Sequence, residues 1–210
     1  MSTSNFLRVG LTGVIGSGKS LTISFFEKYN WKTFSCDAAV HELLSKDILV
    51  KERLVGLFGD GLLDSQNHII RSRLAGIIFA DPRRREQVEG IFHPLVREKW
   101  QNAISQDPLN QWVVEVPLLF EKNLEKFFDL SVCVGCRPEV QMDRLLQRGW
   151  SLQEIKSRLD SQLPLQAKIS RANTVFWNDG AHKWLEAQVR HWIQHVAPNT
   201  FSIHSSSLSK

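Results

Sequence analysis

The chain has 210 residues, of which 42% are hydrophobic and 23% charged, and its net charge is +4. This composition excludes a disordered or membrane-embedded chain and allows one well-formed core with a smaller appended lobe. The arginines are spread over several segments rather than gathered in one patch, so the charge does not predict a nucleic-acid-binding protein.

The two ends of the chain and its cysteines bear on the compartment. Residues 1–11 contain neither the apolar region nor the small-residue cleavage site of a secretory signal. The three cysteines are too few for a disulfide framework, which fits a reducing environment. We therefore expect a cytoplasmic protein, with a disordered tail over about residues 197–210, where serines are concentrated.

Strand-like and helix-like segments alternate along the chain, which predicts an α/β fold with a parallel five-stranded sheet. A glycine-rich stretch follows the first expected strand, and a helix that buries Leu21, Phe25 and Phe26 comes next. The five expected strands cover residues 7–12, 32–36, 112–116, 130–135 and 174–177.

Two long helical stretches interrupt this alternation. The stretch over about residues 40–100 is too long for a simple crossover and predicts a helical lobe. The second covers about residues 137–168. It contains Ser151 and Glu154 at the spacing of a capping box, which predicts the start of a new helix.

Residues 13–20 read G-V-I-G-S-G-K-S and match the phosphate-binding loop, or P-loop, G-x-x-x-x-G-K-[ST] in full. The glycines allow a sharp turn that aims backbone N–H groups at phosphate oxygens, and the following helix N-terminus favours negative charge. Lys19 is expected to be an exposed charge that reaches the β- and γ-phosphates of ATP, and the Ser20 hydroxyl would hold Mg²⁺. The nucleotide-binding residues are expected to be Gly13, Gly16, Ser17, Gly18, Lys19, Ser20 and Leu21.

A P-loop alone does not identify the class of enzyme. The chain has no N-K-x-D stretch for guanine, and its nearest match to the acidic strand of a motor ATPase is V-V-E-V, which carries Glu115 alone. The small size and the two helical stretches favour a small-molecule kinase, with one stretch binding the acceptor and the other closing as a lid.

Further motifs follow the P-loop in a specific order, and together they resemble the dephospho-coenzyme A kinase family from about residue 7 to residue 180. The stretch V-G-L-T-G at residues 9–13 runs into the P-loop and shares Gly13 with it. The later motifs are Asp37 with V-H-E-L-L at 40–44, H-P-L-V at 93–96, P-L-L-F-E at 117–121, the lid pattern of Gln141, Arg144, Arg148, Arg158, Gln162 and Lys168, and finally Asn178 with Gly180.

The resemblance implies a P-loop kinase that phosphorylates the ribose 3′-hydroxyl of dephospho-CoA with ATP and Mg²⁺, giving CoA and ADP. The sequence departs from the family pattern at three positions. Val14 replaces a second glycine, Ser35 replaces the first Asp of a D-x-D pair, and Asn173 replaces an Asp. Val14 is tolerable if that position needs only ordinary backbone angles, and the role of the missing carboxylate at Ser35 is open.

Asp37 is expected at the carboxyl end of a strand, which is the edge where open α/β sheets bind ligands. Its carboxylate could accept the proton of the attacking hydroxyl or hold that hydroxyl in line. The structural alternative is a helix N-cap for a segment beginning at Ala38. We expect the catalytic role, because the resemblance supports it.

Several basic residues are candidates for substrate contacts. Arg144 and Arg148 are four residues apart and share a helix face, so they could close over the triphosphate, although a solvated basic face is the alternative. His93, Arg71 and Arg97 are candidate contacts to the acceptor. His93 could instead be a core or capping histidine, and the arginines plain surface charge.

Other features predict structure rather than function. Cys133 and Cys136 form a C-x-x-C pair that begins inside an expected strand, so neither a zinc site nor a redox pair is expected. Most of the seven tryptophans are expected to pack in the core or lobe. The run at Arg83, Arg84 and Arg85 is either a solvated face or a surface for a phosphate-bearing substrate.

Two alternatives to a dephospho-CoA kinase remain, namely another small-molecule kinase and a non-enzymatic nucleotide-dependent switch. No nucleic-acid or membrane partner is expected, and the sequence leaves the oligomeric state open.

Overall fold

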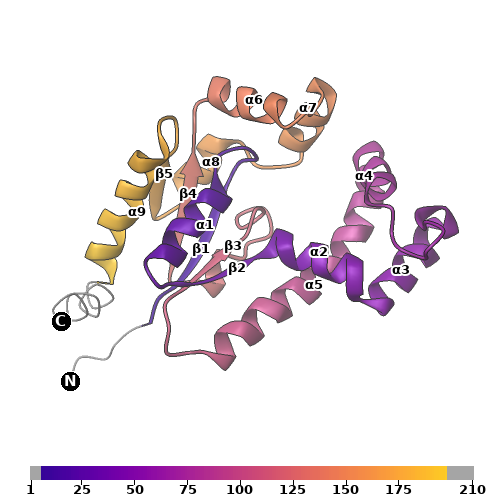
Figure 1. Ribbon diagram of the computed structural model, residues 1–210, viewed down its shortest axis with the longest axis horizontal. Coiled ribbons are helices and arrows are strands. Elements are labelled where there is room, and N and C mark those ends of the chain that lie inside the picture. Colours follow the sequence, from indigo (N-terminus) through magenta and orange to yellow (C-terminus); the bar gives the residue numbers. More distant parts are fainter. Residues whose placement is uncertain (1–5, 198–210) are drawn as a thin grey trace. The chain divides into compact units, whose positions relative to one another are not determined.

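The computed structural model describes residues 6–197, and these divide into two compact units (Figure 1). The sheet unit consists of the chain up to Phe34 and from Asp107 onward, and the helical unit is Ser35–Gln106. The tail expected over about residues 197–210 lies outside the described residues, apart from Ala197 itself.

The sheet has five strands in the order β2-β3-β1-β4-β5, so the strand that leads into the P-loop lies at its centre. Strand β1 pairs in parallel with β3 and β4, and β4 pairs in parallel with β5. This confirms the predicted α/β fold. The strands are β1 (Arg8–Gly13), β2 (Lys32–Ser35), β3 (Trp112–Glu115), β4 (Leu130–Gly135) and β5 (Thr174–Trp177).

The expected strands agree with these bounds to within one residue at each end. Strands β4 and β5 have the predicted limits. Strand β2 ends one residue early because Cys36 already begins helix α2, for which Ser35 is the N-cap. Strand β1 is shifted by one residue, from 7–12 to Arg8–Gly13.

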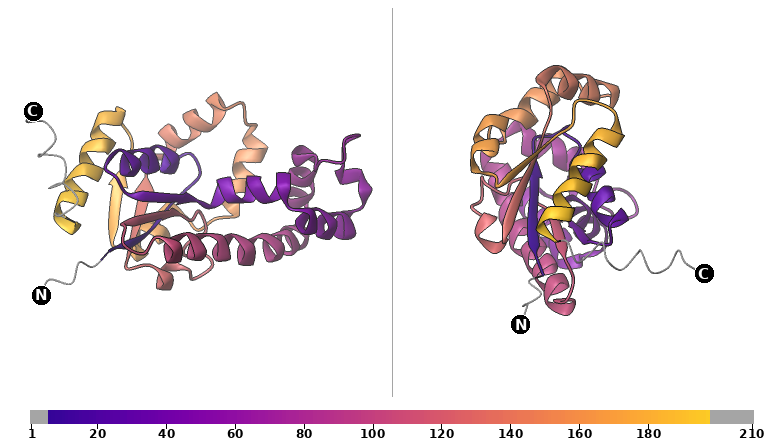
Figure 2. Two further views of the ribbon diagram at one scale, coloured as in Figure 1. Left: turned by 60° about the horizontal axis from the view of Figure 1, so that its bottom comes forward. Right: turned by 90° about the vertical axis from the view of Figure 1, so that its left-hand side faces the viewer.

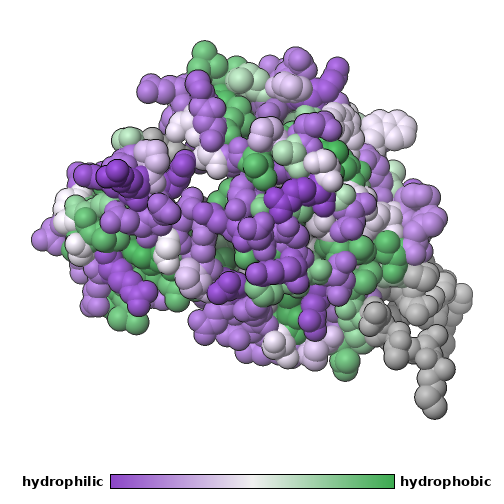
Figure 3. All heavy atoms as spheres, turned by 180° about the vertical axis from the view of Figure 1, so that it is seen from behind, coloured by the Kyte–Doolittle hydropathy of each residue, from purple (hydrophilic) through white to green (hydrophobic). Residues whose placement is uncertain are grey.

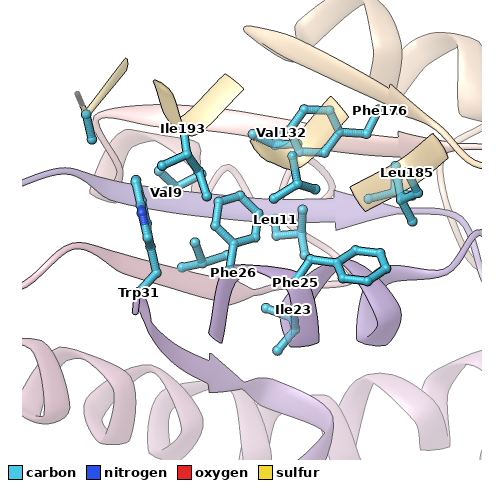
Figure 4. Close-up of a cluster of buried hydrophobic side chains, with 14 residues drawn as sticks. Val9, Leu11, Ile23, Phe25, Phe26, Trp31, Val132, Phe176, Leu185 and Ile193 are labelled. Carbon is cyan, nitrogen blue, oxygen red and sulfur yellow. The ribbon is translucent and has the colours of Figure 1, made fainter. Parts of the chain in front are cut away.

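One face of the sheet is covered by α1 (Lys19–Lys28) and α9 (His182–Val196), which contact each other in Figures 1 and 2. Between these helices and the sheet lies a cluster of buried hydrophobic side chains, in which the ring centre of Phe26 lies 5.3 Å from that of Trp31 and 6.4 Å from that of Phe176 (Figure 4). Phe25 and Phe26 are buried as predicted, whereas Leu21 packs only against the edge of the cluster.

The second helical stretch of the sequence forms three helices, α6 (Pro138–Gln147), α7 (Leu152–Asp160) and α8 (Leu165–Arg171), preceded by the short 3-10 helix η2 (Glu125–Phe127). The predicted capping box is present in full. The Ser151 hydroxyl accepts from the Glu154 N–H, and the Glu154 carboxylate accepts from the Ser151 N–H. Helix α8 packs on strands β4 and β1.

The helical unit contains α2 (Cys36–Lys46), α3 (Ile48–Phe58), the 3-10 helix η1 (Asp60–Leu62), α4 (Arg71–Ala80) and α5 (Pro82–Gln106). Its own apolar centre includes Leu43, Leu54 and Trp100. Helix α5 continues through Pro94, which lacks an N–H for the helical ladder. A single antiparallel bridge between Leu63 and Ile69 closes the connection that precedes α4.

The face of the molecule in Figure 3 is mostly hydrophilic, and its hydrophobic side chains lie in separate small patches. Among the described residues, no helix is both long and apolar enough to cross a membrane. Trp31, Trp100 and Trp112 are buried, in line with the expectation that most of the tryptophans are packing residues. Trp177, the last residue of β5, is 41% exposed, and Trp184, in the first turn of α9 (His182–Val196), is 63% exposed.

Candidate active site

The P-loop joins the carboxyl end of β1 to the N-terminus of α1. Its three glycines have positive φ angles of 149° at Gly13, 79° at Gly16 and 104° at Gly18, which side-chain-bearing residues rarely adopt. Val14 is not among the residues with positive φ, so its departure from the family pattern carries no backbone strain. The turn therefore has the backbone that a phosphate-binding loop requires.

Lys19 was expected to be an exposed charge, and this expectation is wrong. Its relative exposure is 9%, and its Nζ donates to the carbonyl oxygens of Gly13 (3.2 Å) and Val14 (3.3 Å). A buried ammonium needs such partners, because burial without them would be costly. The charge predicted to reach the phosphates thus lies inside the loop, held by the loop's own backbone.

The other loop carbonyls accept hydrogen bonds from outside the loop. Gln141 Nε2, on α6, donates to Ile15 O at 2.6 Å. Asn178 Nδ2, in the connection after β5, donates to Ser17 O at 2.8 Å, and its side chain is almost fully buried. Neither residue was predicted as a site residue, although both belong to the motif pattern that carries the family resemblance.

Arg144 contacts the P-loop. Its Nη1 lies 3.4 Å from Gly16 O, so the guanidinium reaches the P-loop from α6. Arg148 is not brought there by any hydrogen bond or ion pair among the described residues. It is exposed and occupies the C-cap of α6.

Ser20 and Leu21 lie in the first turn of α1, where backbone N–H groups have no partner within the helix. Ser20 is exposed, whereas Ser17 is buried and its Oγ has no hydrogen-bond partner. Glu115 is also buried and ends strand β3, opposite Leu11 of β1. Oxygen ligands from Ser20 and Glu115 suit a hard cation such as Mg²⁺.

A buried ion pair lies behind the loop. Lys168, which is fully buried, donates to Pro117 O at 2.7 Å and pairs with Glu121 Oε1 at 2.8 Å. Pro117 O also accepts from Thr12 Oγ1, next to the P-loop, and Glu121 Oε1 accepts from the Leu163 N–H. These bonds fix the segment after β3 to β1 on one side and to the α7–α8 connection on the other.

Asp37 lies in the first turn of α2 and is exposed. The alternative that it caps a helix beginning at Ala38 is wrong, because α2 begins at Cys36 and its N-cap is Ser35, whose hydroxyl accepts from the Ala38 N–H. The departure at Ser35 is therefore explained as a cap. The Asp37 carboxylate is left for a different role.

The remaining candidates for acceptor contacts all lie in the helical unit. Arg71 begins α4 and approaches His41 of α2, with 3.1 Å between Nη1 and Nδ1. His93 and Arg97 lie one turn apart on α5. His93 is in the middle of that helix, so the alternative that it caps a helix is wrong.

The helical unit also contains a hollow of about 700 Å³. Its charged groups already have partners, because Arg73 Nη1 donates to Gly61 O at 2.6 Å and Arg84 lies 3.7 Å from Asp81. The rest of its wall is mainly apolar. The lining residues are Phe58, Gly61, Leu62, Arg73, Gly76, Ile77, Ala80, Asp81 and Arg84.

Two of the departures and motifs noted in the sequence have structural explanations. Asn173 Oδ1 accepts from both the N–H and the hydroxyl of Ser131, at 2.8 and 2.9 Å, so an amide oxygen does what a carboxylate oxygen could do.

Burial raises the pKa of the Cys133 thiol to about 11 and also raises that of Cys136. Both thiols thus stay protonated near neutral pH, which favours a packing role.

Comparison with known proteins identifies the family. The family model described as dephospho-CoA kinase matches residues 7–183. The chain belongs to the dephospho-CoA kinase family. The dephospho-CoA kinase of Thermosynechococcus vestitus is 35% identical over 188 residues, which cover 89% of this chain and 93% of the relative. The dephospho-CoA kinase of Aquifex aeolicus is 33% identical over 186 residues, which cover 87% and 94%.

Solved structures agree with this assignment. The structure of TT1252 from Thermus thermophilus has a TM-score of 0.76 at 29% identity and covers 90% of this chain and 97% of its own. Dephospho-CoA kinase from Campylobacter jejuni has a TM-score of 0.67 at 26% identity, with 91% and 98% covered. This dephospho-CoA kinase family member is therefore a phosphotransferase with the P-loop kinase fold.

Proposed function

We propose that this chain transfers the γ-phosphoryl group of ATP to the ribose 3′-hydroxyl of dephospho-CoA, which yields CoA and ADP in the last step of coenzyme A biosynthesis. The observation that carries the proposal is the P-loop with its three positive-φ glycines, in a chain that matches the dephospho-CoA kinase family over residues 7–183.

The donor end is the P-loop. Backbone N–H groups of the loop and of Ser20 and Leu21 bind the phosphates of ATP, and the α1 N-terminus adds a favourable dipole. Lys19 and Arg144 place positive charge where negative charge spreads over the transferring group. Since Arg148 lies one turn beyond Arg144, it joins the phosphates when α6 closes over them.

The residues present fit Mg²⁺. Ser20 has an exposed hydroxyl, to which no side chain or backbone group of the described residues hydrogen-bonds, and Glu115 supplies a buried carboxylate at the end of the neighbouring strand. Ser20 would hold the ion. When bound, the ion neutralises charge on the β- and γ-phosphates.

The acceptor end is the helical unit, with Asp37 as the residue that orients or deprotonates the attacking hydroxyl. Its carboxylate is exposed and is not used as a helix cap. Arg71, His93 and Arg97 contact the acceptor, and the two arginines are suited to its diphosphate.

The hollow of the helical unit takes the neutral pantetheine arm of dephospho-CoA. Its wall is mainly apolar, and Arg73 and Arg84 already have partners, so it suits an uncharged chain better than a phosphate. Binding energy from this arm, which does not react, would position the reacting hydroxyl.

Residues 137–168 act as a lid. Closure would exclude water from the transferring group, and helix α6 already bears two side chains that touch the P-loop. Hydrogen exchange across residues 144–168 should slow when ATP and acceptor are both bound. Equal protection in the free and bound protein would count against a lid.

The cytoplasm is the compartment we propose, because the reaction needs ATP and the chain carries cysteines outside disulfides. The proposal involves a small-molecule acceptor and neither nucleic acid nor membrane.

The deciding experiment is the mass of the product formed from dephospho-CoA, ATP and Mg²⁺. A gain of one phosphoryl group at the ribose, with stoichiometric ADP, supports the proposal. The fold does not identify the acceptor, because shikimate kinase from Bacteroides thetaiotaomicron shares it, with a TM-score of 0.52 at 16% identity. A panel of other acceptors therefore tests whether the protein is a different small-molecule kinase. ADP release that does not depend on any acceptor would favour a switch.

A further inference from the structure

The carbonyl oxygens of five consecutive P-loop residues each accept a hydrogen bond from a side chain. Helix α1 supplies one donor, α6 supplies two, and the connection after β5 supplies one. The bonds are Lys19 Nζ to Gly13 O (3.2 Å) and Val14 O (3.3 Å), Gln141 Nε2 to Ile15 O (2.6 Å), Arg144 Nη1 to Gly16 O (3.4 Å) and Asn178 Nδ2 to Ser17 O (2.8 Å).

Two of these bonds orient peptide groups whose N–H could donate to a bound anion. In a trans peptide the C=O and the following N–H point in opposite directions, and none of the described peptide bonds is cis. The bond from Gln141 therefore fixes the direction of the Gly16 N–H, and the bond from Asn178 fixes that of the Gly18 N–H. Both of these glycines have positive φ.

The N–H groups of Gly16 and Gly18 differ from that of the residue between them. The Ser17 N–H donates to Val14 O at 3.2 Å inside the turn, whereas no acceptor for the Gly16 or Gly18 N–H is found among the described residues. Backbone N–H groups left without an acceptor in such a turn can line an anion-binding concavity. The two amide side chains thus hold the two peptides whose N–H groups remain for a ligand.

The packing around these bonds is tight enough to keep them in place. A Cβ atom on Gly18 would lie 2.1 Å from Asn178 Nδ2, and one on Gly16 would lie 3.2 Å from Leu145 on α6. Asn178 is itself anchored, because its backbone N–H donates to Gly135 O at 2.8 Å. The loop thus needs glycine at Gly18 both for its φ angle and to admit the Asn178 amide.

We propose that Gln141 and Asn178 are positioning residues for phosphate binding. Each holds a P-loop carbonyl outward so that the next N–H faces the β-phosphate of the nucleotide. The proposal rests on the proposed function only in taking the bound anion to be a nucleotide phosphate. Helix α6 carries Gln141, so its position and the shape of the phosphate site are coupled.

The test compares Gln141→Glu with Gln141→Met, using ADP affinity measured by calorimetry between about pH 5.5 and pH 8. A carboxylate cannot donate and repels the Ile15 carbonyl, whereas a protonated carboxyl group can donate its O–H. Lys19 and Arg144 also bond to carbonyls of the same loop. Dividing by the wild-type affinity at each pH removes their common effect.

We expect Gln141→Glu to bind ADP about 10–100-fold more weakly than wild type at pH 8. At pH 5.5, where roughly 6% of an ordinary glutamic acid is protonated, it should bind about 1.5- to 7-fold more tightly relative to wild type than at pH 8. Gln141→Met should show a similar loss without the recovery. Gln147→Glu, on the same helix but exposed and away from the loop, is the matched control and should bind like wild type at both pH values.

Wild-type affinity in both Gln141 variants would overturn the proposal, as would a loss in Gln141→Glu that does not recover at low pH. If the Gln141 variants do not fold, Asn178→Asp and Asn178→Leu provide the same comparison at Ser17 O. ADP affinity needs no acceptor, so a failure of dephospho-CoA phosphorylation in the wild type leaves this test intact and sinks only the proposed function.

Discussion

The P-loop and the helical unit hold their candidate functional side chains in opposite ways. Around the loop, the side chains of Lys19, Asn178 and Lys168 are buried, and each makes hydrogen bonds to backbone carbonyls. In the helical unit, Asp37 and Arg97 are exposed, and the ion pairs lie at the surface.

The comparison shows that the fold by itself determines the backbone shape of the P-loop, where the phosphates of ATP are proposed to bind. Buried bonds to carbonyls leave a peptide little freedom, so the loop does not need a ligand to define its shape. Asp37 and Arg97 are exposed instead, and on our proposal the bound acceptor completes the arrangement of the acceptor residues. Changes around the loop should therefore act on nucleotide affinity or on stability as well as on catalysis, whereas changes in the helical unit should act on catalysis or acceptor affinity alone.

The largest effect is expected from Asp37→Asn. It should lower kcat by about two to four orders of magnitude, the usual range for loss of a general base, while the affinity for ATP changes little. Steady-state kinetics with both substrates varied provides the measurement. Ser35→Ala is the control, because it removes the helix cap but not the carboxylate and should keep kcat near the wild-type value. A near-normal kcat in Asp37→Asn would remove Asp37 from the catalytic residues.

The next effect is expected from Lys19→Met, which keeps an apolar stem but removes the charge. We expect kcat to fall about 10²–10³-fold, the range for loss of one transition-state donor. Because Lys19 also bonds two loop carbonyls, the nucleotide affinity should fall as well, unlike in Asp37→Asn. Unchanged turnover in this variant would contradict the assignment of the P-loop.

The buried pair of Lys168 and Glu121 sharpens the comparison through stability. Lys168→Met leaves a buried carboxylate without its cation and should lower the free energy of unfolding by about 3–5 kcal/mol. The double variant Glu121→Gln, Lys168→Met should recover much of this loss. Urea unfolding measures these free energies. The control is Lys99→Met, which breaks an exposed pair with Glu42 and should leave the free energy of unfolding nearly unchanged. A single variant as stable as wild type would show that the pair is dispensable.

A smaller effect is expected from filling the hollow of the helical unit. Gly76 lines it, and a Cβ there would have no neighbour within 4 Å, so Gly76→Trp can occupy the space. The KM for dephospho-CoA should rise about tenfold, because the acceptor loses its apolar contacts in the hollow, while the KM for ATP stays constant. Gly90→Trp on α5, also unobstructed but outside the hollow, is the matched control. Equal KM values in the two variants would place the pantetheine arm elsewhere.

The smallest effect concerns the cysteines. Burial raises the pKa of Cys133 to about 11 and raises that of Cys136, so neither presents a thiolate at pH 8. Iodoacetamide at that pH should therefore modify Cys36, which is partly exposed, well before the other two, as peptide mapping by mass spectrometry would show. Rapid modification of Cys133 in folded protein would contradict its burial.

Much of the fold was predictable because it depends on local signals. The alternation of apolar strands and helical stretches, the P-loop motif and the Ser151 capping box each concern neighbouring residues, and the structure confirms them. The errors came where two signals competed within one or two residues. Asp37 and Ser35 are both good helix caps, and only the backbone decides that Ser35 caps α2.

The P-loop motif of the candidate site was predictable, but the side chains that hydrogen-bond to its carbonyl groups were not. Gln141 and Asn178 are ordinary polar residues in the sequence, 126 and 161 positions from the loop residues that they contact. No local pattern reports such a contact, and only their places in the family resemblance singled them out. The burial of Lys19 was missed for a related reason, since its partners are backbone carbonyls that any sequence would supply.

The sequence by itself determined that this protein has a phosphate-binding loop on a parallel α/β sheet, because glycine spacing and hydrophobic periodicity act through neighbouring residues. It also determined the family, through the order of motifs along the chain. Tertiary structure alone decided which side chains satisfy the loop carbonyls, where Lys168 and Glu121 meet and which thiols are buried. These are contacts between segments far apart in the chain, and their energies depend on burial, which exists only once the chain has folded.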